Sequence, residues 1–212
     1  MKIKIENLSK AFDNNYVLKN INIELEEGNI YGFVGRNGSG KSVLFKIMCG
    51  LYKPTEGAIY YNNKNICEND DFPENTRALI EKPTFLSDIS GYDNLKLLAD
   101  IQGKIGKKEI EGAMDLVGLL DEKDKKYYKY SLGMKQKLGI AQVIMEDPQV
   151  MIFDEPFNGL DNSSVLKIRD YLKNIKKHKI IIVASHIKED IEIICDKTYL
   201  IDNGEVTINN KY

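Results

Sequence analysis

Apolar and polar residues alternate, or apolar residues gather in short runs, over much of the first sixty positions. This pattern predicts strands, because successive side chains of a strand point to opposite faces. Clusters of Asn, Asp, Glu and Gly separate the segments and are typical of turns. The predicted strands are Ile3–Leu8, Val17–Leu25, Ile30–Val34 and Ala58–Tyr61.

A helical pattern replaces the strands from about residue 90 to residue 146. Ile110, Met114 and Val117 recur at the spacing of one helix face, and Gly118 marks the end of that helix. Strands and amphipathic helices then alternate, which predicts an α/β fold with a parallel sheet. The predicted strands are Val150–Phe153 and Ile180–Ala184, and the helical faces comprise Val165, Ile168, Leu172 and Ile175, and Ile187, Ile191 and Ile194.

A glycine-rich segment follows the predicted strand Ile30–Val34 and precedes an apolar helical run. Its residues are Gly35-Arg36-Asn37-Gly38-Ser39-Gly40-Lys41-Ser42, in the order G-x-x-x-x-G-K-S. The strand–loop–helix context is the one in which this order cradles the phosphates of a nucleotide. A glycine-rich turn that carries Lys and Ser by coincidence is the alternative.

Each residue type in this loop suits a phosphate ligand. Glycine permits backbone angles closed to other residues and lets amide groups approach phosphate oxygens, which we expect of Gly35, Gly38 and Gly40. The following helix directs the positive end of its dipole at the anion. Lys41 would place a cation on the outer phosphates, and Ser42 would offer its hydroxyl to Mg²⁺.

Two carboxylates end the apolar run that begins at Val150. Acidic residues at the carboxyl end of a buried strand lie where ligands bind in open α/β sheets. Asp154 would bind Mg²⁺, directly or through water, and Glu155 would polarise the attacking water. A solvated strand end is the alternative, and the phosphate loop makes it the weaker one.

A segment shortly before the acidic strand resembles the signature of ATP-binding cassette (ABC) ATPases, usually written L-S-G-G-Q. It reads Tyr130-Ser131-Leu132-Gly133-Met134-Lys135-Gln136, in which Ser131 and Gly133 match the signature. Tyr130, Leu132 and Met134 depart from it, and this variant is similar to that of bacterial antibiotic- and bacteriocin-export cassettes. On its own, Ser131 would be an ordinary helix cap.

The resemblance covers nearly the whole chain and implies further site residues. His186 would contact the γ-phosphate and act with Glu155 and Lys41 in catalysis. Glu81 stands where the family commonly has a glutamine, and would join Ser42 and Asp154 at Mg²⁺, although an ionised carboxylate cannot donate a hydrogen bond. The implied ATP-binding residues are Phe12, which would stack on adenine, Gly35, Arg36, Asn37, Gly38, Ser39, Gly40, Lys41, Ser42, Val43, Ser131 and Gly133.

The resemblance also implies the architecture and the assembly. Residues 1–212 would form one ABC domain: a P-loop NTPase core with a parallel sheet, an antiparallel N-terminal β subdomain, and a helical subdomain inserted at about 84–147. Two chains, identical or related, would pair head to tail. Each ATP would then lie between the phosphate loop of one chain and Ser131 and Gly133 of the other.

Charge and apolar content reduce the number of possible functions further. Lys and Arg total 30 against 32 Asp and Glu, a formal net charge of −2, so no basic excess predicts nucleic-acid binding. No apolar stretch is long enough to cross a bilayer, so a separate membrane permease is expected. We therefore expect a cytoplasmic protein, peripheral on the inner face of the cell membrane. Three widely spaced cysteines without zinc-ligand spacing are typical of free thiols.

The function implied by the resemblance is ATP hydrolysis that powers the permease, with export of a peptide antibiotic or similar compound. An ATPase of an uptake system is the nearest alternative. A soluble ABC ATPase acting on DNA or ribosomes is another, but the chain has neither sustained heptads nor a second cassette. A cassette that binds ATP without hydrolysing it is disfavoured by the presence of both Glu155 and His186.

Overall fold

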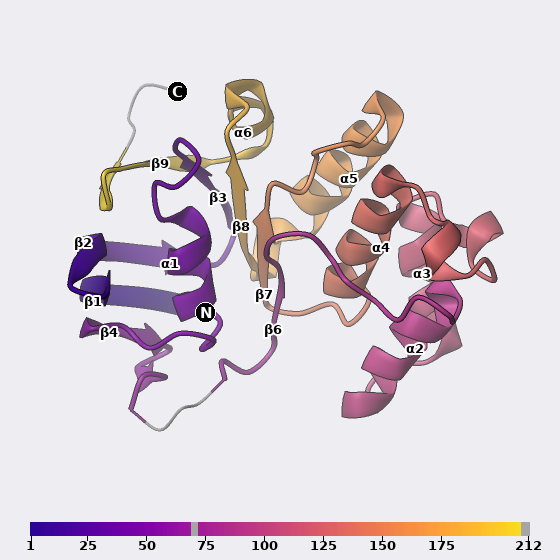
Figure 1. The fold of residues 1–212 in the computed structure, drawn as a ribbon, viewed down its shortest axis with the longest axis horizontal. Helices are drawn as coiled ribbons and strands as arrows, with labels where there is room; N and C mark the ends of the chain where they lie inside the picture. Colours follow the sequence, from indigo (N-terminus) through magenta and orange to yellow (C-terminus); the bar gives the residue numbers. More distant parts are fainter. Residues whose placement is uncertain (69–71, 209–212) are drawn as a thin grey trace.

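The computed structural model describes residues 1–68 and 72–208, and Figure 1 shows two sheets with helices between and beside them. The smaller sheet is antiparallel and has the strand order β2-β1-β4-β5. It accounts for the alternating pattern at the start of the chain, since one face of β1 and β2 is buried and the other is exposed. Its strands are β1 (Lys2–Phe12), β2 (Asn15–Glu26), β4 (Glu56–Tyr61) and β5 (Lys64–Asn65).

The larger sheet has the strand order β10-β9-β3-β8-β7-β6 and is parallel except for β10. Every residue of β7 and β8 is buried, which explains their unbroken apolar runs. Asn203 and Gly204 turn between β9 and β10 with positive φ, as a tight hairpin requires. The strands are β3 (Asn29–Val34), β6 (Thr76–Leu79), β7 (Val150–Asp154), β8 (Ile180–Ser185), β9 (Lys197–Asp202) and β10 (Glu205–Ile208).

The helices divide into three groups. In Figure 1, α1 lies between the two sheets, α5 and α6 lie beside the larger sheet, and α2, α3 and α4 gather at one end of the molecule. Short 3-10 turns at Leu120–Glu122, Tyr127–Lys129 and Lys176–His178 interrupt the connections. The helices are α1 (Lys41–Met48), α2 (Gly91–Gln102), α3 (Lys107–Leu116), α4 (Leu132–Ile144), α5 (Asn162–Ile175) and α6 (Lys188–Ile194).

Two apolar cores cover opposite faces of the larger sheet. Ile152 of β7 belongs to the core that includes α1 and the antiparallel sheet, whereas Phe153 belongs to the core formed with α2–α6. Neighbouring residues of one strand therefore serve different cores, as the pleat of a strand dictates. The predicted fold class, a parallel core with an antiparallel N-terminal sheet and a helical subdomain, is confirmed.

One predicted helix face includes a residue that lies before the helix begins. Ile187 is extended, caps α6 and remains 39% exposed, whereas Ile191 and Ile194 are buried as predicted. The difference arises because the chain turns at the end of β8 and becomes helical only at Lys188. Cys49, Cys67 and Cys195 are free, in agreement with the sequence. None of the helices in the described residues is long and apolar enough to cross a membrane.

Candidate functional site

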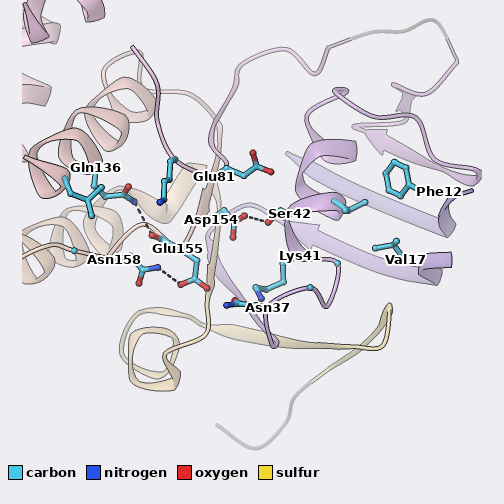
Figure 2. A pocket seen from close by; sticks show the side chains of 16 residues that line it. Phe12, Val17, Asn37, Lys41, Ser42, Glu81, Gln136, Asp154, Glu155 and Asn158 are labelled. Atoms are coloured by element: carbon cyan, nitrogen blue, oxygen red, sulfur yellow. Dashed lines mark hydrogen bonds between the residues drawn. The ribbon is translucent and has the colours of Figure 1, made fainter. Parts of the chain in front are cut away.

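A cavity of about 700 Å³ lies between the α1 side of the molecule and the start of α4, and Figure 2 shows the side chains that line it. Its walls come from five separate segments of the chain. They are the end of β1 with the start of β2, the phosphate loop with α1, the turn after β6, the start of α4, and the segment after β7. The lining residues are Phe12, Val17, Asn37, Gly38, Gly40, Lys41, Ser42, Val43, Glu81, Lys82, Leu132, Gln136, Asp154, Glu155, Asn158 and Gly159.

Glycine is required in the phosphate loop for two different physical reasons. Gly38 and Gly40 have φ values of +81° and +106°, which side chains disfavour, as predicted. Gly35 does not have a positive φ, so the unusual backbone angle predicted for it was wrong, whereas its approach to phosphate stays a prediction. A Cβ at Gly35 would lie 2.4 Å from the Ile201 carbonyl oxygen and 2.6 Å from Ser39 Oγ, so close packing against β9 requires the glycine.

The Lys41 ammonium is held against the loop that precedes it. Nζ donates hydrogen bonds to the carbonyl oxygens of Gly35 at 2.6 Å and Arg36 at 3.0 Å, and the residue is only 6% exposed. Burial lowers the pKa of Lys41, and the charges of Glu155 and Asp154 oppose that change. A desolvated cation at the start of α1 suits a polyanion, because a helix N-terminus favours negative charge.

Asp154 and Ser42 meet across the cavity although they are far apart in the sequence. The Ser42 hydroxyl donates a hydrogen bond to Asp154 Oδ2, as Figure 2 shows. Burial raises the pKa of Asp154, the Ser42 hydroxyl lowers it, and the charge of Glu155 raises it again. A hydroxyl beside a carboxylate fits Mg²⁺, which prefers oxygen ligands and takes few of them from the protein when phosphates are present.

Glu155 and His186, which the resemblance implies act in catalysis, lie in hydrogen-bond contact with each other. β7 and β8 are parallel neighbours with Asp154 opposite Ala184, and this register brings the two residues together. Glu155 Oε1 accepts from the His186 backbone amide at 3.0 Å, and Oε2 lies 2.8 Å from His186 Nδ1. Asn158 Nδ2 donates to the same Oε2 at 3.4 Å, so Glu155 is fixed from three directions. Its φ of +52° marks a constrained turn at the strand end.

Glu81 lines the cavity, but its carboxylate pairs with a residue that sequence reasoning missed. Lys46 Nζ donates to Glu81 Oε1 at 2.5 Å, and this contact raises the pKa of Lys46. Lys46 lies on α1, five positions after Lys41, and nothing in the local pattern sets it apart from other helix lysines. Glu81 has a φ of +63° at the turn after β6.

Phe12 lines the cavity and contacts a second aromatic ring that is not part of the lining. Phe12 is the last residue of β1, is 41% exposed, and meets Tyr52 edge to face with 5.8 Å between ring centroids. Val17 and Val43 line the same cavity. Phe12 therefore lines the cavity, and its stacking on adenine stays a prediction.

Ser131 and Gly133 stand apart from the other predicted ligands. Ser131 caps α4 by accepting from the Met134 amide at 3.2 Å, so the helix-cap interpretation is also correct. A Cβ at Gly133 would lie 2.8 Å from the Gly159 carbonyl oxygen, which explains the glycine there. Neither residue is among the sixteen that line the cavity.

Other predicted ligands border a second cavity, of about 890 Å³, which is also lined by part of the phosphate loop. Gly35, Arg36, Ser39 and His186 line it, and Asn37 and Gly38 border both cavities. Gln136 is a further residue whose role the sequence did not reveal. Its buried amide Nε2 donates to the carbonyl oxygens of Glu155 at 3.1 Å and Pro156 at 3.2 Å, joining α4 to the end of β7.

Known proteins are similar to this chain in sequence and in fold. The family model described as ABC transporter matches residues 18–158. The bacitracin transport ATP-binding protein BcrA of Enterococcus faecalis is 39% identical over 96% of this chain and 67% of the relative. The lantibiotic transport ATP-binding protein SrtF of Streptococcus pyogenes is 32% identical, over 99% of this chain and 91% of the relative.

A solved structure gives the same result for the fold. The ATP-binding subunit of an ABC transporter is 25% identical, with a TM-score of 0.89, and the match covers 99% of this chain and 90% of that subunit. The chain belongs to the ABC transporter family, as an ATP-binding and ATP-hydrolysing subunit.

Proposed function

We propose that ATP and Mg²⁺ bind in the 700 Å³ cavity and that Glu155 orients the water that attacks the γ-phosphate. Lys41 would neutralise the outer phosphates, and Ser42 and Asp154 would hold Mg²⁺, with Glu81 at its side. When bound, Mg²⁺ supplies positive charge that offsets the charge of the phosphates. The observation that carries this proposal is the fixed Glu155–His186 pair beside Lys41 and the Ser42–Asp154 pair.

The proposed ATP site is completed by a second cassette. Ser131 and Gly133 lie outside the cavity of their own chain, although the resemblance implies that they bind phosphate. Leu132, between them, is 66% exposed, so the start of α4 is open to a partner. In a head-to-tail pair, the amide groups at this helix start would face the γ-phosphate held by the other chain. The pair would be a homodimer or would include a related cassette, and the assembled domain would span residues 1–212 with its helical insertion at about 84–147.

The proposed partner that converts hydrolysis into transport is an integral-membrane permease. A groove of about 510 Å³ lies between the edge strand β6, the end of α1 and the end of α2. Leu51 and Phe72 border it and are 56% and 68% exposed, and Ile80 places the groove next to Glu81. We assign this groove to a cytoplasmic segment of the permease, which would hold the chain at the inner face of the membrane.

The proposed cargo is a peptide antibiotic or a similar compound, moved outward. The support comes from two relatives named for bacitracin and lantibiotic transport, together with the Tyr130–Gln136 signature variant. An uptake system and a function on DNA or ribosomes receive no comparable support.

Affinity purification tests the permease proposal. The tagged chain is purified from detergent-solubilised membranes of its host, and stoichiometric partners are identified by mass spectrometry. We expect one polytopic membrane protein or a pair of them. Leu51→Glu should abolish that recovery, because it puts a charge into the apolar groove. Leu166→Glu, at an equally exposed site on α5 (58%), is the matched control and should retain the partner.

Two results would contradict the proposal. One is recovery of the chain with ribosomes or DNA-processing proteins in place of a membrane protein. The other is equal loss of the membrane partner in both glutamate variants, since this would exclude the groove as the specific contact.

A further inference from the structure

We propose that Arg169 is a positioning residue for Glu155 and His186, acting through Asp190 and Phe157. The inference rests on the catalytic roles proposed for Glu155 and His186. Arg169 lies on α5 and contacts Asp190 and Phe157, which belong to the segments that follow β8 and β7. Its function would be to keep those two segments in register.

One side of the Arg169 guanidinium reaches the His186 segment. Nη2 donates to Asp190 Oδ1 on α6, and the two residues are only 8% and 9% exposed. Asp190 Oδ2 accepts from Ser185 Oγ at 3.3 Å, and Ser185 Oγ accepts from the Ile187 amide at 3.0 Å. These bonds hold the residues on both sides of His186, so they define the turn from which its imidazole projects.

The other side of the guanidinium reaches the Glu155 segment. Arg169 Cζ lies 5.0 Å from the centroid of the Phe157 ring, which is buried two residues after Glu155. A guanidinium over an aromatic face is attracted by the ring quadrupole, and the attraction is stronger away from solvent. One side chain therefore contacts the turn that carries Glu155 directly and the turn that carries His186 through Asp190.

The chemistry of Arg169 indicates that it orients the two turns and is not retained only for the stability of the fold. Its Nε is buried and has no hydrogen-bond partner among the described residues, which is an unfavourable feature for a group retained only for stability. Replacing a buried ion pair by apolar residues is often neutral, whereas a planar fork fixes the direction of its partners. Arg169 combines that fork with a ring contact, and so fixes two turns at once.

The test compares kcat and KM for ATP in the full chain carrying Arg169→Met or Asp190→Asn. We expect kcat to fall roughly 10- to 100-fold, as small displacements of catalytic groups produce, with KM within about twofold. Arg169→Lys should restore part of kcat, because it keeps a cation beside Asp190 and Phe157. The double variant Arg169→Met/Asp190→Asn should lose no more than the worse single variant, since the residues act as one unit.

Lys179→Met is the matched control for loss of a buried cation. Lys179 is 8% exposed and donates to the carbonyl oxygens of Asp147 and Pro148 at 3.0 and 2.8 Å, at the end of β8 away from His186. The Lys179→Met variant should have a melting temperature lowered about as much as that of Arg169→Met. Its kcat per folded molecule should stay within about twofold of wild type.

Glu155→Gln, assayed in parallel, separates the two proposals. If Glu155→Gln retains normal turnover, the assignment of Glu155 fails. If Glu155→Gln is inactive but Arg169→Met keeps the kcat of the Lys179→Met control, only the positioning role fails. Additive losses of kcat in Arg169→Met/Asp190→Asn would also contradict the positioning role of Arg169.

Discussion

Two charged residues of the cavity, Lys41 and Asp154, are buried deeply enough that their pKa values move in opposite directions. Burial is the first cause in both cases: it lowers the pKa of Lys41 and raises that of Asp154, so both charged forms are disfavoured. Phosphate would favour the charged form of Lys41, and a divalent cation would favour that of Asp154. The protein thus holds two charges whose unfavourable desolvation a Mg²⁺–ATP complex would offset.

The Lys41 ammonium should make ATP binding depend on pH. ATP affinity should fall as pH rises towards 10.5, the ordinary lysine value, because the lowered pKa lets Lys41 lose its proton earlier than an exposed lysine would. Phosphate binds protonated Lys41 more tightly than neutral Lys41. At high pH, ATP binding must therefore be accompanied by uptake of a proton, and this requirement lowers the affinity for ATP. Titration calorimetry at increasing pH measures the effect.

Lys41→Ala supplies the control for that titration. It should weaken ATP binding roughly 10- to 100-fold, the loss expected for one charged hydrogen bond, and should flatten the pH dependence. Lys173→Ala, at an exposed position of α5, should leave both properties unchanged. Equal affinity in wild type and Lys41→Ala would mean that the loop does not bind phosphate as proposed.

Residues within the motifs could be predicted from the sequence, and residues that act through remote contacts could not. Lys41, Ser42, Asp154 and Glu155 follow from local order, because a loop before a helix and acids after a buried strand have few other uses. Lys46, Gln136 and Arg169 contact partners 35, 19 and 21 positions away. Their spacing indicates no common face, so only the folded structure reveals them.

At the scale of elements, α4 connects three functional segments. Ser131 caps its start, Gln136 holds the backbone after β7, and Gly139 packs against the turn that carries Glu81. A Cβ at Gly139 would lie 2.9 Å from Leu79 Cδ1 and 2.9 Å from Pro83 Cβ. The sequence predicted the helix and its cap, but a single glycine in a helix does not indicate what it approaches.

Substitution of Gly139 tests this packing. Gly139→Ala should destabilise the fold by about 1–3 kcal/mol, because the new methyl group must displace β6 or the Pro83 segment. Gly112→Ala is the matched control: Gly112 is also inside a helix, but a Cβ there meets nothing within 4 Å. It should stabilise the fold by about 0.5–1 kcal/mol through helix propensity. Denaturant unfolding measures both, and equal effects would contradict the close approach of α4 to β6.

At the scale of the whole molecule, the cavity lies beyond the carboxyl ends of β6 and β7 and beside the phosphate loop that follows β3. This edge of a parallel sheet is where α/β proteins bind ligands, and the predicted alternation of strands and helices indicated it. The contribution of α4 was less predictable. Ser131, which caps its start, and Gly133 lie outside the lining of the cavity in their own chain, and this supports a site completed by a second cassette.

The solution mass of Glu155→Gln, with and without Mg²⁺–ATP, tests the shared site most directly. This change keeps the shape of Glu155 and removes its charge, so ATP should bind without turnover and should hold two chains together. Light scattering should report two chains with ATP and one without. Adding Ser131→Asp should prevent pairing, since Asp caps a helix as well as Ser but repels phosphate, whereas Ser131→Asn should permit it. A monomer with bound ATP, or pairing unaffected by Ser131→Asp, would contradict the account.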